Sequence, residues 1–219
     1  RFAAARSVVG FGADFLDHGS TRTVRDWAAA RSVETHGEAA AQTVIFSAQA
    51  TITGASADRR YRVRSNHLPA LAGALAKLVA TALKAPAAAL LGALDVKAVA
   101  TTAGVSEKAL QAVADRLVAN AGASIVIAGG PDSTPELEVA VNLLNDVLGN
   151  NGKTVLQDGR AAHSGFAALR KLVQEMNSGS VDTLIIAGTN PVLAGSALGF
   201  AKAAKKVANV VVLTDRLDE

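Results

Sequence analysis

The stretch Ile185–Leu193 reads IIAGTNPVL, an apolar run that breaks into a turn of Gly, Thr, Asn and Pro. The run is typical of a buried strand, and the alanine-rich stretch that follows it has helical character. A strand that ends in such a turn before a helix often holds a phosphate or a nucleotide on its backbone N–H groups. The stretch therefore predicts a strand, a turn and a helix of a parallel α/β sheet.

The same pattern occurs near the start of the chain. Val8–Leu16 reads VVGFGADFL, and it too is followed by a helical stretch and then by a β-rich strand. That later strand is Thr43–Phe46 in the first copy and Asn209–Leu213 in the second. Two similar Rossmann-like halves are the simplest account of the repeat. We expect residues 1–104 to form the first lobe with a linker, and residues 105–219 to form a truncated second lobe.

The spacing of apolar residues predicts the remaining elements. Further strands are expected at 124–128 and 154–156, and helices near 21–31, 69–83, 106–120, 135–148, 166–179 and 196–206. Ser106 is a plausible N-cap, and Ser133 and Glu136 have the spacing of a capping box. Strands that alternate with helices predict an α/β fold, with mostly parallel sheets and helices on both faces.

Composition supports this fold class. Hydrophobic residues make up 50% of the 219 residues and aromatics only 4%, so Ala, Val and Leu must build the core. Such a core suits parallel strands under alanine-rich helices better than a β-sandwich. The longest apolar run, Leu71–Leu83, contains Lys77 and predicts a buried helix. The chain begins at Arg1 without Met, and we expect an internal piece of a longer protein.

Charged and metal-binding residues give weaker signals. The densest basic segment, Arg59–Arg64, favours an exposed edge or loop over a nucleic-acid surface, because no nucleic-acid-binding motif surrounds it. The absence of Cys excludes disulfides, Cys-based zinc sites and Cys-ligated iron–sulfur clusters from these residues. The histidines show no metal-ligand spacing, so isolated surface or capping histidines are expected and no metal ligand is assigned. They are His18, His36, His67 and His163.

Three turns are candidate ligand sites, because ligands of parallel sheets bind at the carboxyl ends of strands. They are Gly10–Asp14, Gly129–Gly130 and Gly188–Pro191. None carries a complete G-x-G-x-x-G or P-loop sequence, so a ligand site and a purely conformational role for the glycines both stay open. No motif frames a nucleophile and a base, and no catalytic residue is assigned. The candidate cofactor-binding residues are Gly12, Asp14, Gly188, Thr189, Asn190 and Asp215.

Four segments, taken in order, resemble the molybdopterin oxidoreductase superfamily. Gly12–Ser32 and Met176–Val192 are similar to the openings of its two Rossmann-like domains. Ala50–Val79 resembles a Thr-x-Thr-Ala-x-x-Ala-Asp sequence that is followed by a Leu-x-Ile/Val-Arg-Pro-Gly segment, and Val211–Glu219 resembles the strand before a Glu-Thr-Ala element. The resemblance covers nearly the whole chain and implies an oxidoreductase of this superfamily.

Within that superfamily, GADFLDHGSTRTVRDWA, SADRRYRVR and LLNDVLGNNGKTV are together most similar to the iron–sulfur subunit of alternative complex III. The resemblance implies a respiratory quinol oxidoreductase that is attached to a bacterial membrane through partner subunits, on the periplasmic side. It implies electron transfer from quinol to a soluble acceptor through 4Fe–4S clusters that lie outside these residues. No nucleic-acid partner is expected, because no binding motif surrounds the basic segment Arg59–Arg64.

Departures from the superfamily pattern bear on the cofactor. Members that bind the pterin cofactor usually carry an Asp-Pro-Arg-like segment after the second strand, where Ser47–Thr51 here reads SAQAT. Asp14 replaces Asn in the first turn and places a carboxylate where a diphosphate would approach. The resemblance therefore implies a cofactor-free structural domain with vestigial site residues. The alternative is a true molybdenum or tungsten enzyme, whose bis-pyranopterin guanine dinucleotide would use Gly188–Pro191 and Asp215.

Overall fold

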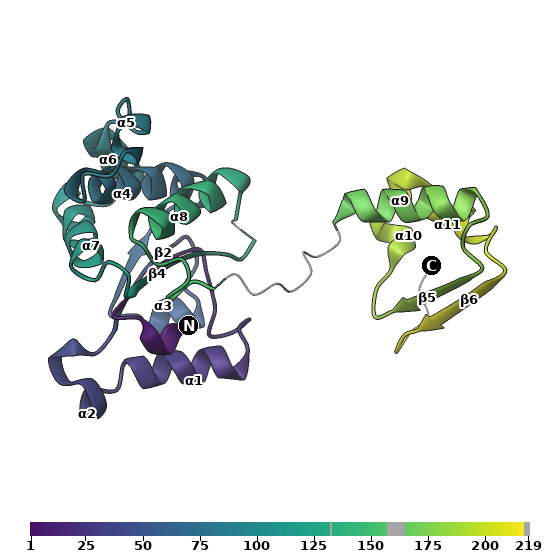
Figure 1. Ribbon diagram of the computed structural model, residues 1–219, viewed down its shortest axis with the longest axis horizontal. Coiled ribbons are helices and arrows are strands. Elements are labelled where there is room, and N and C mark those ends of the chain that lie inside the picture. The colour runs from purple at the N-terminus through teal and green to yellow at the C-terminus, as the bar shows by residue number, and fades with distance from the viewer. Residues whose placement is uncertain (132, 157–164, 217–219) are drawn as a thin grey trace. The chain divides into compact units, whose positions relative to one another are not determined.

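The computed structural model describes residues 1–131, 133–156 and 165–216 (Figure 1). The chain forms two compact units, Arg1–Gln157 and Asp158–Glu219. The structural boundary thus differs from the expected one between residues 104 and 105. The reason is that the strand at 124–128 pairs with the first strand of the chain instead of starting a second sheet.

The first unit contains one parallel sheet. Its strands are β1 (Ser7–Phe11), β2 (Gln42–Ser47), β3 (Arg59–Arg62) and β4 (Ser124–Ala128). All neighbours are parallel, and the strand order is β3-β2-β1-β4. The chain runs outward from β1 to β3 and then returns to the other side of β1. The strand order therefore reverses between β1 and β4, which is where α/β proteins usually bind ligands.

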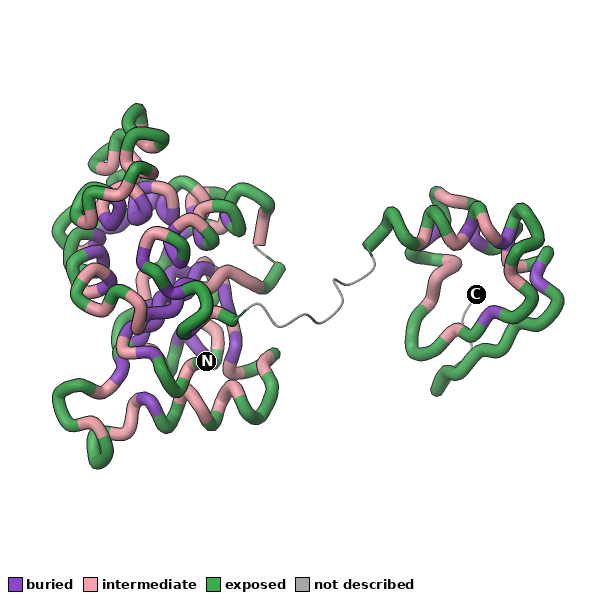
Figure 2. The backbone as a smooth tube through the Cα atoms, in the orientation of Figure 1, coloured by how far each residue is buried: buried purple, intermediate pink, exposed green. Residues whose placement is uncertain are grey.

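Helices cover both faces of this sheet, so the predicted α/β class is confirmed. On one face, α4 (Leu68–Ala82), α6 (Val96–Ala103), α7 (Glu107–Ala119) and α8 (Pro135–Val147) enclose the larger apolar cluster. On the other face, a smaller cluster joins Val8, Ile45 and Ile125 to Phe15 and Trp27. Figure 2 shows the buried backbone of this unit concentrated in the sheet and in the helices that pack on it. The remaining elements of this unit are η1 (Phe2–Ala4), α1 (Thr21–Ala30), α2 (Val33–His36), η2 (Gly37–Ala39), α3 (Ile52–Ser56), η3 (Ser65–His67) and α5 (Ala87–Leu90).

Helix α4 is the most buried helix of the first unit. Leu71, Leu75 and Val79 are fully buried at i, i+4 and i+8, which confirms the buried helix expected from the apolar run. Its one internal charge, Lys77, donates hydrogen bonds to the carbonyl oxygens of Gly92 and Leu94. Within the described ranges, no helix is both long and apolar enough to cross a membrane.

The N-cap of α7 is the residue predicted from the sequence, whereas the N-cap of α8 is not. Ser106 caps α7 as expected, because its side chain accepts a hydrogen bond from the Ala109 N–H. The cap of α8 is Thr134 instead of Ser133, and its side chain accepts from the Leu137 N–H. Pro135 explains the shift, since proline occupies the first helical position and leaves the preceding residue as the cap.

The expected strand at 154–156 does not form. Val155 makes only an isolated bridge with Asn151, and two buried asparagines occupy the edge of β4 instead. Asn145 accepts a hydrogen bond from the Val126 N–H at 3.1 Å and donates one to the Val126 carbonyl at 2.7 Å. Asn150 accepts from the Ser124 hydroxyl at 3.1 Å. Side-chain amides thus satisfy backbone groups that a further strand would otherwise pair.

The second unit is a two-stranded parallel sheet with helices. Its elements are α9 (Phe166–Asn177), β5 (Thr183–Ala187), α10 (Pro191–Ala194), η4 (Ser196–Leu198), α11 (Phe200–Ala204) and β6 (Asn209–Leu213). The helix expected at 196–206 is interrupted, because Gly199 adopts a left-handed φ of 70° between η4 and α11. Ile185 pairs with Val211, and their side chains are 66% and 46% exposed.

Candidate ligand site at the switch of strand order

The turns after β1 and β4 meet at the point where the strand order reverses. Gly12 follows β1 with φ 66°, and Gly130 follows β4 with φ 79°. A Cβ atom on Gly130 would lie 2.8 Å from the carbonyl oxygen of Gly12, so the two backbones approach too closely for a side chain. Two of the three turns predicted from the sequence are therefore brought together at one place.

These turns line a cavity of about 380 Å³ at the carboxyl ends of the strands. Its other wall is the segment after β2, which is the SAQAT stretch of the sequence. The cavity is lined by Gly12, Asp14, Asp17, His18, Ser47, Gln49, Ala50, Thr51, Ile52, Gly130 and Pro131. The position is the one expected for a ligand of an open parallel sheet.

The carboxylate of Asp14 accepts hydrogen bonds from another segment of the protein. Its Oδ1 atom accepts hydrogen bonds from the Thr53 N–H at 2.9 Å and from the Thr53 hydroxyl at 2.6 Å. The same hydroxyl oxygen accepts from the Leu16 N–H at 2.9 Å. Because Thr53 lies in the first turn of α3, Asp14 places its negative charge at the start of that helix. A bound anion would use the same N–H group.

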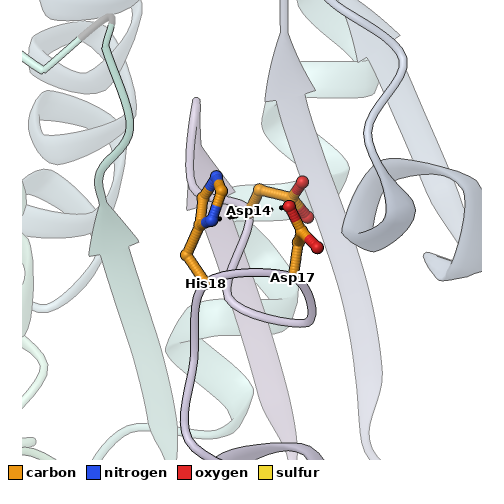
Figure 3. A group of neighbouring side chains, drawn as sticks. All are labelled: Asp14, Asp17 and His18. Atoms are coloured by element: carbon orange, nitrogen blue, oxygen red, sulfur yellow. Dashed lines mark ion pairs between the residues drawn. The ribbon is translucent and has the colours of Figure 1, made fainter. Parts of the chain in front are cut away.

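Asp14 also has two neighbours that sequence reasoning missed (Figure 3). The Nδ1 atom of His18 lies 3.4 Å from Oδ2 of Asp17, and one ligand atom from each of Asp14, Asp17 and His18 lies within 4.8 Å of the others. Two carboxylates and an imidazole are a donor set that could hold a divalent metal ion. The D-x-x-D-H spacing at residues 14–18 could have predicted this cluster, whereas the spacing between the histidines alone could not.

His18 is therefore not the isolated histidine that we expected. His36 lies in the last turn of α2, and His67 precedes α4 without a side-chain capping hydrogen bond. His163 lies outside the described residues.

The segment after β2 is held by Arg60. Its Nε donates to the Ser47 hydroxyl at 3.1 Å, and its Nη2 donates to the carbonyl oxygen of Ala48 at 3.3 Å. The Ser47 hydroxyl in turn donates to the carbonyl oxygen of Gln49 at 2.9 Å. The chain's own arginine thus occupies polar groups of the SAQAT stretch that follows β2.

The second unit repeats the backbone geometry of the first turn. Gly188 has φ 61°, and its N–H donates to the carbonyl oxygen of Leu213 at 3.0 Å. In the first unit, the N–H of Gly12 donates to the carbonyl oxygen of Phe46 at 2.8 Å. The acceptor in the first unit is the last residue of β2 that pairs with β1, and the acceptor in the second unit is the last residue of β6 that pairs with β5. The two turns predicted as a repeat have the same backbone pairing.

The remaining candidate residues lie together in the second unit. Asn190 caps α10, since its Oδ1 accepts from the Leu193 N–H at 3.0 Å. Asp215 is 81% exposed, and its Oδ1 lies 3.3 Å from Nε of Arg216. By strand register Asp215 corresponds to Ala48, which lies in the SAQAT stretch of the first unit. One cavity of about 740 Å³ is lined by Gly188, Thr189, Asn190, Leu213, Thr214, Asp215 and Arg216.

No protein-family model matches the chain, and no curated protein matches its sequence.

Proposed function

We propose that this chain is a cofactor-free, molybdopterin-oxidoreductase-like domain with a structural role in a membrane-associated quinol oxidoreductase of the alternative complex III type. The observation that carries the proposal is the position of Asp14. Its carboxylate binds the Thr53 N–H and hydroxyl at the start of α3, in the cavity where the cofactor's diphosphate would approach.

The cavity of the first unit fits a dinucleotide poorly. Two like charges about 4 Å apart near a protein surface repel by roughly 1 to 4 kcal/mol, and a diphosphate would face the charge of Asp14. The carboxylate of Asp17 lines the same cavity. Replacement of the Asp-Pro-Arg-like segment by SAQAT removes a ribose or base partner as well. These features support a fold that keeps the strand-and-turn geometry without the nucleotide.

Electron transfer in such a complex would be carried by iron–sulfur clusters outside these residues. The 219 residues contain no Cys, so they supply no thiolate to a cluster. The role of this chain is then to support neighbouring subunits, and the domain itself transfers no electrons between quinol and the soluble acceptor.

Element and pterin analysis of the protein, purified within its native complex, tests the proposal. We expect neither molybdenum nor tungsten in stoichiometric amount, while a bis-pyranopterin enzyme processed in parallel gives full occupancy. Stoichiometric molybdenum or tungsten together with extracted pterin would overturn the structural role.

The second candidate is a true bis-pyranopterin enzyme. It is favoured by one observation, the shared cavity of Gly188, Thr189, Asn190 and Asp215 in the second unit. Hydrogen exchange with and without guanosine diphosphate separates the candidates. Protection of residues 188–193 that is lost in Asp215→Ala supports the enzyme, and unchanged exchange in the wild type supports the structural domain.

A further inference from the structure

A separate cavity of about 450 Å³ lies between α7 and the amino ends of β2 and β3. It is at the opposite end of these strands from the turns described above. Gln42 and Val44 of β2, Arg59 and Tyr61 of β3, and the stretch of α7 from its cap Ser106 to Arg116 form its walls. The volume is within the range of small-molecule sites, roughly 300 to 1,000 Å³.

The charges of this cavity all have one sign. Arg59, Lys108 and Arg116 line it, and no carboxylate does. Among the described residues, none of these three side chains has an ion pair or a hydrogen bond. The Nε atom of Arg116 is buried and has no hydrogen-bond partner. Three cations without a carboxylate among the lining residues make the cavity complementary to an anion.

Arg116 also lines a neighbouring cavity that contains Glu38. No ion pair joins the two side chains within the described part of the chain. Arg116 is therefore available to a ligand in the cavity that it shares with Arg59 and Lys108. The start of α7 adds a partial positive charge to the same cavity, because its cap Ser106 belongs to the lining.

The other walls of the cavity are apolar. Val44 and Val113 are each only 6% exposed, and Ala109 and Ala112 lie between the charged residues of α7. The ring of Tyr61 is held by stacking on Phe46, with the ring centroids 5.2 Å apart. A ligand that combines an anionic group with an apolar ring would complement both kinds of wall.

We propose that this cavity binds a small phosphate monoester that carries a flat apolar group. A phosphate monoester has a charge of about −1.5 to −2 near neutral pH, whereas a carboxylate has only one negative charge. Three cations without an acid favour the more highly charged group, and arginine binds phosphate oxygens with paired N–H groups. This proposal holds whether or not a cofactor binds in the cavity that Asp14 lines.

Phenyl phosphate is the probe that tests this assignment. In calorimetric titrations we expect saturable binding that weakens as salt is added, with benzoate binding more weakly and phenol not binding. In ¹⁵N spectra the shifted amides should lie in β2, β3 and α7. Lack of saturable binding, or benzoate binding as tightly as phenyl phosphate, would overturn the proposal.

Variants on one strand provide a matched control. Arg59→Gln and Lys108→Gln should each weaken phenyl phosphate binding by about tenfold, the loss expected for one charge-assisted contact. Arg62→Gln removes the same charge from an exposed arginine of β3 outside the cavity lining and should leave binding unchanged. An equal loss in Arg62→Gln would show a diffuse charge effect, as on a nucleic-acid surface, and would contradict a built site.

Discussion

Single residues show how closely the site of the first unit is fixed. Gly130 and Gly104 have the same kind of left-handed backbone, with φ 79° and φ 73°. A Cβ atom on Gly130 would meet the Gly12 carbonyl oxygen at 2.8 Å, whereas one on Gly104 would meet nothing within 4 Å. A substitution at Gly104 therefore adds backbone strain alone, whereas one at Gly130 adds backbone strain and a steric clash.

We predict that Gly104→Ala lowers the free energy of unfolding by about 1 kcal/mol, through the left-handed backbone alone. Gly130→Ala should lower it by roughly 2 to 3 kcal/mol, because the backbone of the Gly12 turn must also move. Urea unfolding at equilibrium measures both values. Equal losses would mean that the turns after β1 and β4 do not pack as described.

For single residues, the sequence predicts where turn glycines lie better than it predicts which residues form hydrogen bonds with each other. Gly12 and Gly188 could be predicted from a local pattern, because each follows an apolar strand directly. The partner of Asp14 could not, since Thr53 is 39 residues away in the chain. The neighbours Asp17 and His18 could have been found from their spacing alone. Contacts between distant segments depend on strand order, which no local pattern specifies.

At the scale of elements, a side-chain amide takes the place of a neighbouring strand at the edge of β4. The amide of Asn145 pairs with both backbone groups of Val126, and its Nδ2 also donates to the Val141 carbonyl at 3.1 Å. Helix α8 and strand β4 are thus joined by hydrogen bonds in a buried place. Apolar spacing predicted both elements but not this connection.

Asn145→Ala should lower the free energy of unfolding by about 3 kcal/mol, because it leaves the buried N–H and carbonyl of Val126 without partners. Asn151→Ala, an exposed asparagine of the same loop region, should change it by less than about 0.5 kcal/mol. Thermal or urea unfolding compares the two variants. A small effect of Asn145→Ala would show that water or another group replaces the amide.

A second connection between elements depends on Asp58. Its carboxylate pairs with the guanidinium of Arg31 and accepts from the Thr43 N–H at 2.7 Å. Arg31 lies over the ring of Trp27, which donates to the Thr43 hydroxyl at 2.9 Å. Burial raises the pKa of Asp58, but the hydrogen bonds from Arg31 and Thr43 outweigh it and lower the pKa below 3.8.

Because the folded pKa of Asp58 is lowered, its stabilising effect is complete above the unfolded value of 3.8 and is lost as the pH falls through the folded pKa. At about pH 7, Asp58→Asn should cost about 1 kcal/mol, a value reduced because the side chain is partly exposed to solvent. The difference between variant and wild type should shrink below about pH 4. Urea unfolding over this pH range checks it, and a difference independent of pH would contradict the linkage.

Predictability of elements follows the strength of their local pattern. Helices α4, α7 and α9 have regular apolar stripes and lie where the spacing places them. The helix expected at 196–206 contains the same kind of residues, but Gly199 interrupts it. The strand expected at 154–156 is absent, because the β4 edge is already satisfied by side chains from 145 and 150.

At the scale of the whole molecule, the repeat was easier to detect than the boundary between units. The matching turns at Gly12 and Gly188 are local, whereas the boundary depends on which strand pairs with β1. Strand β4 joins β1 in register from Ser7 with Ser124 to Phe11 with Ala128. Both apolar clusters of the first unit lie within Arg1–Gln157 as a result.

We predict that residues 1–156, expressed alone, fold and unfold in one cooperative transition, because their sheet is covered on both faces. Residues 165–219 alone should lack a cooperative transition, since an isolated two-stranded sheet is marginal in water. Circular dichroism and the fluorescence of Trp27 follow the first piece. A non-cooperative transition in residues 1–156 would contradict the division into units.

The strand edges also bear on how the protein behaves at high concentration. In the first sheet, β3 carries Arg59, Arg60 and Arg62 at one edge, and asparagine amides seal the other against strand addition. In the second sheet, β6 contains no charged residue, and Val210, Val211, Val212 and Leu213 are 43 to 58% exposed. An uncharged β-branched edge is the usual starting point of cross-β aggregation. We therefore expect association at high concentration to begin at β6, and Val211→Lys to raise the solubility of the protein.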